Sequence, residues 1–528
     1  MFRLMKRLIQ FSLTALLAVC CTGQVLDSPA GTPDDPGNGH DQIVLGKQLD
    51  DPYSVENMEK ALSVVYPTKV QRVPVPTTHY YVRFRPANET QYRILLDCGF
   101  ELLDHPMDYE IVKEGDWYHD PSIPEGEFTW QYTVVPKDAT LPRFIQHEIL
   151  HECYIPDDEP TKSADGINWT AVERASFRLT GNEDLLNDLS LTKGNSSETP
   201  AGRITIEDAD LGRVEGVRGV RVACNIFVKT AHAFTDEDGR YRMPRSFSGK
   251  PRYRLVFKNS KGFCIGLNLL LVPASISALG KGEASGLDVQ VTKDSDRRLF
   301  SRCVVNNAGY DYFQRCATSS PSVKTPPSNL RLWLFQSLDF GLTPMLQQGV
   351  LIDGGEVGKL LGMYAILVKL FLPDALVGLK GKDTFASIYA EALHAFAHGS
   401  HFMLAGRDFW DHYIRYLLKS YLTSGFTLYG TGAEEDFGYC EIAEMWAYFA
   451  QGALFKERYG NAISAQFGRD WWFHPQIFEV LAAEGLPWQK IFQVLGADVT
   501  NREILKKKLS SYNPDYKSAI NQAFALYN

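Results

Sequence analysis

The sequence predicts a multidomain α+β protein with a small N-terminal α+β domain, an antiparallel β-sandwich and a mainly α-helical C-terminal domain. Two patterns support this class. Short runs rich in β-branched and aromatic residues recur about every ten residues over 202–293, with Gly and Asp turns between them. Apolar residues three and four positions apart dominate 294–528. The chain has 528 residues, 45% hydrophobic and 22% charged, which suits several domain cores and excludes a disordered or collagen-like polymer.

The N-terminus has the pattern of a lipoprotein signal peptide over residues 1–21. Basic residues precede the apolar run Phe11–Val19, and Cys20 or Cys21 follows as the lipid acceptor. An ordinary cleaved secretion signal is the alternative. Residues 22–42 are rich in Gly, Pro and Asp and predict a flexible tether. We therefore expect an outer-membrane or cell-surface lipoprotein that touches the membrane only through its N-terminal lipid.

The N-terminal domain is expected over residues 43–160, where strand-like runs alternate with turn signals. A helix is predicted over Asp51–Val65, with Ser54 as its N-cap. Residues 161–201 then supply one short helix, Trp169–Leu179, and a linker rich in Ser, Asn and Gly.

The sandwich segment contains the acidic run Thr235–Tyr241, which invites a calcium-loop interpretation. An EF-hand loop requires Glu at its twelfth position, but counting from Asp236 that position is Phe247. A hairpin turn is therefore the favoured interpretation.

Two apolar stretches, Phe263–Gly280 and Leu360–Leu379, are expected to be buried strands or helix pieces, because each contains Pro and further polar residues that are costly in a bilayer. The net charge of -9 comes without a basic stripe and argues against a nucleic-acid partner. The nine cysteines have no CxxC spacing, so neither a disulfide scaffold nor a cysteine zinc site is predicted.

In residues 294–528, a strand within Leu370–Gly378 is expected just before a long helix. This helix begins near Thr384 and runs for about twenty residues, with Asp383 as N-cap and Gly406 at its end. It carries a His-x-x-x-His pair, whose spacing places both imidazoles on one helix face.

That pair is His394 and His398, with His401 one turn further on. A downstream helix offers Glu441 and Glu444 as carboxylates. Two His and one Glu, with one position left for water, form the ligand set of a hydrolytic zinc site. The alternative is three histidines satisfied by hydrogen bonds in a polar core, and spacing alone does not choose between the two.

The general base of an HExxH motif is missing, because Ala395 follows the first histidine. General-base catalysis contributes about 10²–10⁴ in rate, so hydrolysis should be weak or absent even if metal binds. Glu391 lies one turn earlier, about 5.4 Å along the axis. We expect it on the exposed side of the helix; a relay through a second water is the alternative.

A literal HExxH occurs earlier, at His147-Glu148-Ile149-Leu150-His151, with Glu173 22 residues later. An active metallopeptidase centred here is a further hypothesis. Its context is unfavourable, because Pro142 and Tyr154-Ile155-Pro156 leave room for only a turn or two of helix.

Two aromatic segments, Phe409–Tyr413 and Trp471–Phe473, could contact a peptide or a glycan. A non-catalytic surface binding or adhesion protein is therefore a second functional class. Core packing is the favoured interpretation of both segments, because they recur at helical spacing.

The chain resembles a family of bacterial cell-surface lipoproteins that join a carboxypeptidase-regulatory-like (transthyretin-like) β-sandwich to a gluzincin-type, zinc-metallopeptidase-like C-terminal domain. The resemblance covers residues 43–528 and is carried by IVLGKQLDDPYSVENM, MDYEIVKEGDWYHDPSIPEGEFTWQYTVVP, TDEDGRYRM, LHAFAHGSHF, EIAEMWAYF and WWFHPQIFEVLAAEGLPWQKIFQVL.

In this family the histidine helix looks like HELAHASH. The resemblance thus implies His394 and His398 as metal ligands, zinc as the cofactor, and Ala395 as a departure at the catalytic Glu. It favours Glu444 over Glu441 as third ligand. The stretch similar to HEILHECYIP usually lacks both histidines, which disfavours His147 and His151. The resemblance identifies no substrate, and it is compatible with a catalytically inactive member of the family, a pseudoenzyme.

Overall fold

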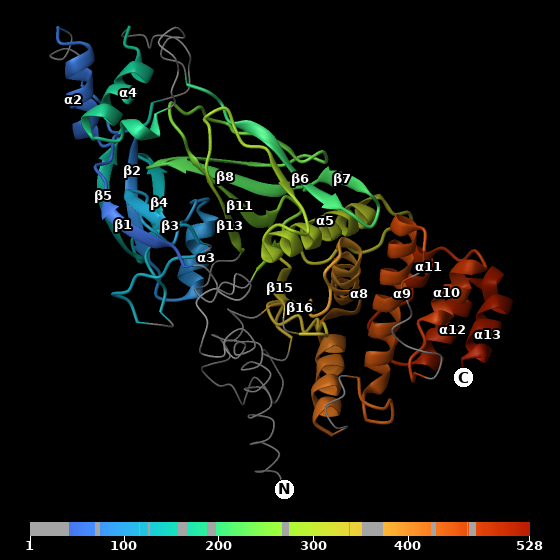
Figure 1. Ribbon diagram of the computed structural model, residues 1–528. Coiled ribbons are helices and arrows are strands. Elements are labelled where there is room, and N and C mark those ends of the chain that lie inside the picture. The colour runs from blue at the N-terminus through green and yellow to red at the C-terminus, as the bar shows by residue number, and fades with distance from the viewer. Residues whose placement is uncertain are drawn as a thin grey trace, which may run out of the picture.

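The computed structural model describes a mixed α+β chain with several sheets and a helical C-terminal region (Figure 1). The description covers residues 42–527 except for 69–73, 116, 125–126, 157–165, 187–196, 267–273, 337, 351–372, 424–428, 462 and 464–470. The expected signal peptide, both candidate lipid acceptors and nearly all of the expected tether lie outside the described residues.

The strands are β1 Val44–Gln48, β2 His79–Arg85, β3 Tyr109–Lys113, β4 Gln131–Pro136, β5 Gln146–Cys153, β6 Ala201–Asp208, β7 Arg213–Gly216, β8 Val220–Ile226, β9 Lys229–Phe234, β10 Arg240–Arg242, β11 Arg252–Asn259, β12 Cys264–Ile265, β13 Ile276–Lys281, β14 Val289–Val291, β15 Arg331–Phe335 and β16 Ala375–Gly378. The helices are α2 Val55–Val65, α3 Glu89–Asp97, α4 Trp169–Leu179, α5 Arg297–Thr318, α8 Phe385–Thr423, α9 Phe437–Tyr459, α10 Gln476–Ala483, α11 Trp488–Gln493, α12 Arg502–Tyr512 and α13 Lys517–Leu526; short 3₁₀ turns are η1 Glu183–Leu185 and η2 Pro514–Tyr516.

The N-terminal region contains the antiparallel sheet β4-β2-β5 and the ribbon β1-β3. Ser54 caps α2 as predicted, since its side chain accepts a hydrogen bond from the Asn57 amide. Helix α4 has the predicted bounds and lies beside α2 (Figure 1). Met58, Leu62 and Val172 share one apolar cluster between these helices, so the segment after residue 160 packs onto the N-terminal region.

A buried carboxyl in this region should make stability depend on pH. Asp51 is 3% exposed, and burial, with Asp108 and Asp50 nearby, raises its pKa to about 7. Its Oδ1 accepts from the Tyr53 amide at 2.9 Å, while Oδ2 has no hydrogen-bond partner among the described residues. Burial disfavours the charged carboxylate, so ionisation of Asp51 destabilises the folded chain.

We expect the free energy of unfolding to fall between about pH 4 and pH 7, by on the order of 3 kcal/mol. In this range the unfolded Asp51 releases a proton that the folded one retains. Replacing Asp51→Asn should flatten this slope in denaturant titrations across pH. The exposed Asp138→Asn is the control; an unchanged slope in Asp51→Asn would contradict the assignment.

Strands β6 to β16 form two further sheets. A four-stranded sheet joins β10, β6 and β14, with β7 on β6. The central sheet has the order β16-β15-β12-β11-β8-β9, with β13 also paired to β11. Its strands β8, β9, β11 and β13 are antiparallel, whereas β12, β15 and β16 run parallel. The central sheet thus continues from the expected sandwich segment into residues of the expected C-terminal domain.

The acidic run at 235–241 forms a turn. The amide of Gly239 donates to Asp236 O at 3.1 Å, and the Asp236 amide donates to Arg240 O at 2.9 Å. Oδ1 of Asp236 accepts from the amides of Asp238 and Arg240. This carboxylate is used by the turn itself, so the turn is confirmed. The predicted hairpin is wrong, because the strands on either side, β9 and β10, belong to different sheets.

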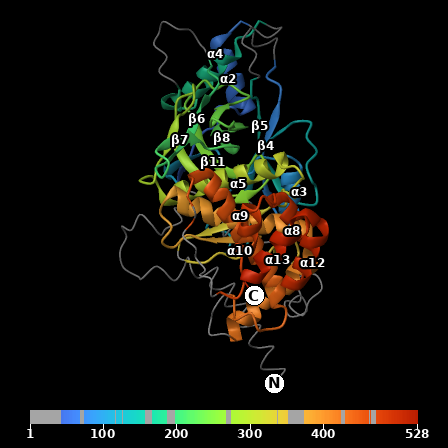
Figure 2. The same cartoon turned by 90° about the vertical axis from the view of Figure 1, so that its right-hand side faces the viewer.

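The C-terminal region is helical, and Figure 2 shows α8, α9, α10, α12 and α13 gathered below the strands. Helix α8 bends at Gly406, whose φ of 82° and ψ of 176° are non-helical, so the predicted helix end is a kink. The expected cap Asp383 is wrong: Thr384 Oγ1 accepts from the Ser387 amide at 3.2 Å, and Asp383 pairs with Arg297 at 2.8 Å.

Parts of the two apolar stretches are strands: β12 and β13 in the first, and β16 in the second. Residues 267–273 and 360–372 of these stretches lie outside the described residues. Within the described part of the chain, no helix combines the length and apolar character that crossing a bilayer requires.

A charged network joins the sheets to the helical region. Arg458, near the end of α9, lies 2.7 Å from Asp208 of β6 and 2.9 Å from Glu215 of β7. Asp311 of α5 is 3.7 Å from Arg458 and accepts a hydrogen bond from Tyr389 of α8 at 2.8 Å. Asp208 is fully buried. The network therefore ties α5, α8 and α9 to β6 and β7.

Candidate metal centre

Helices α8 and α9 place the candidate ligands side by side. His394 and His398 are one turn apart on α8, and Glu444 lies on α9. Two hydrogen bonds clamp the helices around them: Trp446 Nε1 donates to Ala397 O at 3.1 Å, and Gln451 Nε2 donates to Ala390 O at 3.0 Å.

The three side chains converge on one point. His394 Nε2 lies 3.0 Å from His398 Nε2 and 3.4 Å from Glu444 Oε2, and His398 Nε2 lies 3.5 Å from Glu444 Oε1. Four-coordinate zinc with bonds of about 2.0 Å separates its ligand atoms by about 3.3 Å. Among the described residues, this is the one group of three or more His, Cys, Asp or Glu whose ligand atoms all lie within 4.8 Å of one another.

The electrostatics favour in His398 and Glu444 the forms that a metal requires. His398 and Glu444 are each 1% exposed. Burial lowers the pKa of His398 and so favours the neutral imidazole. Burial would raise the pKa of Glu444, but His398 and His394 hold it well below its usual value. Neutral imidazole and ionised carboxylate are the forms that bind divalent ions.

Hydrogen bonding from neighbouring side chains differs between Glu444 and the two histidines. The Tyr413 hydroxyl donates to Glu444 Oε1 at 2.5 Å and so orients the carboxylate. Among the described residues, however, Nδ1 of His394 and Nδ1 of His398 have no hydrogen-bond partner, although ligating histidines usually donate this N–H to a neighbouring acceptor. Aromatic rings contact the two imidazoles instead: between ring centroids, Tyr448 lies 4.4 Å from His394 and Trp410 lies 5.8 Å from His398.

A cavity of about 190 Å³ opens beside His394. It is lined by Ala395, Glu391, Tyr429 and Tyr448, and by the segment 339–343 that bridges to β16. The hydroxyls of Tyr429 and Tyr448 are 3.1 Å apart. The ligand group therefore has space on one side for water or a small substrate group.

Two further residues of the histidine helix line this cavity beside His394. Ala395 is 3% exposed and presents only a methyl group where HExxH would place a carboxylate. Glu391 was expected on the exposed side of the helix, and this is wrong: its side chain is 15% exposed, lines the cavity and pairs with Lys382 at 2.6 Å. Glu391 and Ala395 share a helix face because they are four residues apart, and the segment 339–343 lines the same cavity, which leaves this face partly covered.

The remaining candidates near this pair have other partners. Glu441 is 2% exposed and pairs with Arg502 at 2.5 Å, so it does not join the ligand group. His401 Nε2 donates to Leu495 O at 3.1 Å, and burial lowers its pKa to about 3. The preference for Glu444 over Glu441 therefore agrees with the geometry.

The literal HExxH at 147–151 is not helical but lies on strand β5. His147 is opposite Phe84, and His151 is opposite Tyr81 on β2. Since Phe84 and Tyr81 are three positions apart, and strand side chains alternate between faces, the two histidines lie on opposite faces of the sheet. The structure does not bring them together.

The two companions proposed for that motif are also occupied elsewhere. Glu148 pairs with Arg83 at 2.6 Å. Glu173 is buried and pairs with Lys229 at 3.1 Å, while Tyr53 donates to it at 2.6 Å and Ser248 also bonds it. These contacts tie α4 to β9, which gives Glu173 a structural role.

The aromatic segments pack mainly inward. Phe409, Trp410 and Tyr413 are 0–2% exposed, and Trp410 Nε1 donates to Thr343 O at 2.8 Å. Phe473 is fully buried, whereas Trp471 and Trp472 are half-buried against the main core. The favoured core-packing interpretation is confirmed for the fully buried members.

The sequence reasoning missed Tyr413, Tyr429, Tyr448 and Lys382. Tyr448 lies four residues after Glu444, so helical spacing could have placed it at the site. Tyr413 reaches Glu444 because α8 bends at Gly406. The glycine predicts a break there but not the direction in which the chain continues. Comparison with protein-family models, curated proteins and solved structures finds no match to this chain.

Proposed function

We propose that the helical C-terminal region is a zinc-peptidase-like domain of a cell-envelope lipoprotein, and that it binds a divalent metal with little or no hydrolysis. The observation that carries this proposal is the convergence of His394, His398 and Glu444 within 4.8 Å at a cavity. Two imidazoles and a carboxylate suit zinc, and the cavity side leaves its fourth position accessible.

The three residues would hold the metal through His394 Nε2, His398 Nε2 and the carboxylate of Glu444. A bound zinc ion would polarise a carbonyl or acidify a water. Tyr413 orients Glu444, and Tyr448 with Tyr429 presents hydroxyls to the cavity. Glu391 is the carboxylate nearest in sequence to the missing base, but it is engaged by Lys382.

The proposed lipid anchor, envelope location and domain types are supported by sequence patterns. The basic and apolar pattern of residues 1–21 supports a lipid anchor at Cys20 or Cys21, and hence an envelope location. The family resemblance supports a transthyretin-like sandwich over 202–293 and a metallopeptidase-like domain over 294–528. Ala395 supports a pseudoenzyme or a poor hydrolase rather than an efficient peptidase.

Metal content is the direct test. Wild-type chain dialysed against zinc is expected to retain about one ion per chain by elemental analysis, and His394→Ala with His398→Ala to lose it, because two of three ligands go. His147→Ala with His151→Ala is the matched control, since it removes the other His-x-x-x-His pair. Equal, negligible zinc in wild type and in the first variant would overturn the proposal. Loss of zinc only in the control would move the site to residues 147–151.

A further inference from the structure

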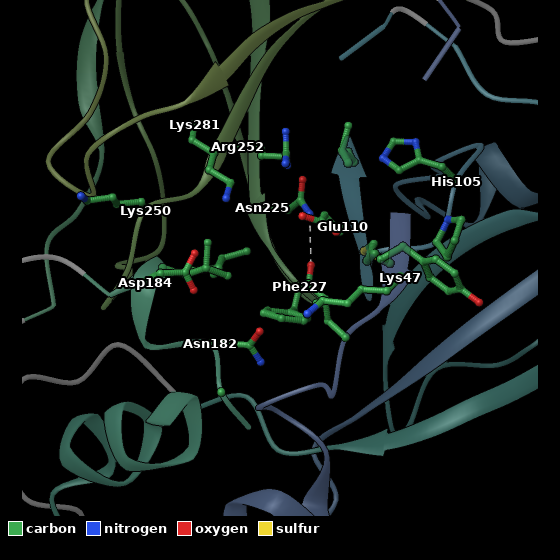
Figure 3. A pocket seen from close by; sticks show the side chains of 18 residues that line it. Lys47, His105, Glu110, Asn182, Asp184, Asn225, Phe227, Lys250, Arg252 and Lys281 are labelled. Atoms are coloured by element: carbon green, nitrogen blue, oxygen red, sulfur yellow. Dashed lines mark hydrogen bonds between the residues drawn. The ribbon is translucent and has the colours of Figure 1, made fainter. Parts of the chain in front are cut away.

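A second cavity, of about 240 Å³, lies between the N-terminal region and the central sheet (Figure 3). Its lining comes from β1 and β3 on one side, and from β11, β13 and the turn between β8 and β9 on the other. The segment 181–185 after α4 completes it. Neither the candidate metal centre nor any of its supporting residues takes part.

Positive charge predominates at this cavity. Lys47, Lys250, Arg252 and Lys281 line it, against the carboxylates of Glu110 and Asp184; His105, also in the lining, pairs with Asp104 at 2.8 Å. In Figure 3 the Lys47 chain reaches across the cavity toward Phe227, and Arg252 and Lys281 lie together on another wall. The four cations thus come from both regions that meet here.

Two of these cations are already engaged and two are not. Arg252 pairs with Glu114, and Lys250 lies 3.8 Å from Glu283. Lys47 and Lys281 are exposed and form no ion pair with any described residue. Burial lowers the pKa of Arg252, which reflects the cost of keeping this guanidinium partly desolvated. An anion in the cavity would offset that cost and use the two unpaired ammonium groups.

The turn between β8 and β9, which lines the cavity, is closely packed. Phe227 and Val228 connect Ile226 to Lys229 as a two-residue hairpin loop, and Phe227 has a φ of 47°. Glycine usually occupies such a position. Phe227 is held there because it is 5% exposed, packs 6.0 Å from the Phe177 ring and accepts a hydrogen bond from Asn225 Nδ2 at 3.1 Å.

We propose that this cavity binds a small ligand that carries a carboxylate or sulfate group on a polar body the size of one sugar ring. The anionic group is inferred from the ammonium groups of Lys47 and Lys281, which form no ion pair with any described residue, and from the partly buried guanidinium of Arg252. The size follows from the volume, which is below the range of about 300–1,000 Å³ typical of sites for larger ligands.

The test is calorimetric titration of the full chain with glucuronate and with N-acetylglucosamine 6-sulfate, which separate carboxylate from sulfate. Glucose and inorganic sulfate are the controls for the ring and for the ion. At least one acidic sugar is expected to bind, more weakly as salt rises. Binding should fall roughly tenfold in Lys47→Gln with Lys281→Gln, because charge-assisted hydrogen bonds are lost.

Two control variants separate loss of this cavity from a general loss of charge and from loss of the candidate metal centre. Lys293→Gln with Lys324→Gln removes two other exposed lysines and should bind as wild type does. The variant His394→Ala with His398→Ala should also bind normally, because the two sites share no residue. Failure of both acidic sugars to bind, equal binding of glucose, binding of inorganic sulfate alone as an adventitious ion only, or no effect of the Lys47 and Lys281 changes would each overturn the proposal.

Discussion

Peptide hydrolysis is expected to rise by about 10²–10⁴-fold when Ala395 is replaced by glutamate, because a general base typically contributes that much. Residue 395 directly follows the first histidine of the pair and lines the cavity beside it. The cavity of about 190 Å³ has room for the added carboxylate. Initial rates with a fluorogenic peptide set, on zinc-loaded wild type and Ala395→Glu, measure the change.

Ala395→Gln is the matched control, since it adds the same bulk without a basic group. Its rate of hydrolysis should stay at the wild-type level, and all three proteins should contain the same number of zinc ions per chain. If Ala395→Glu holds zinc and is no faster than Ala395→Gln, then position 395 does not face the reacting water. The proposed zinc-peptidase-like domain would then have to rest on metal binding alone.

The second large effect is expected at Arg458. Replacing Arg458→Met should lower the free energy of unfolding by about 3–5 kcal/mol, because it removes the charged partner of the fully buried Asp208. Glu215 keeps Arg213 and Arg218 as partners. Arg458 is 9% exposed by side chain and also lies over the Tyr389 ring, 4.7 Å from its centroid. Urea titration followed by tryptophan fluorescence gives the difference.

Arg240→Met is the comparison, since Arg240 and its partner Asp238 are 60% and 61% exposed and exposed pairs contribute at most about 1 kcal/mol. Combining Arg458→Met with Asp208→Asn should recover part of the loss, as expected for residues in one network. Equal losses for Arg458→Met and Arg240→Met would show that the network does not hold the helices to the strands.

Local patterns predicted the elements that depend on local chemistry. The helix at 169–179, the Ser54 cap, the strand before α8 and the break at Gly406 all follow from capping residues, β-branched runs and glycine. The continuity of the central sheet across residue 293 was not predictable, because pairing of β12 with β15 joins segments far apart in the sequence. The same limit applies to residues 147–151, where pairing with β2 outweighs a motif typical of helices.

The ligand pair was predictable, because four-residue spacing on a helix fixes a shared face. The third ligand was not decided by spacing: Glu441 and Glu444 lie on the same helix, and only tertiary contacts separate them. Arg502 engages the first and the two histidines face the second. Glu391 was misplaced because its exposure depends on what covers α8, including the segment 339–343, and no helical pattern contains that information.

The bend at Gly406 makes one helix contribute to the candidate centre twice. The part before the bend supplies both imidazoles. The part after it supplies Tyr413, whose hydroxyl donates a hydrogen bond to the Glu444 carboxylate of α9. The three candidate ligands come from the part before the bend and from α9, so coordination would require α9 to be docked on α8. Zinc uptake during refolding would therefore report the docking of α9 on α8, rather than the formation of any single helix.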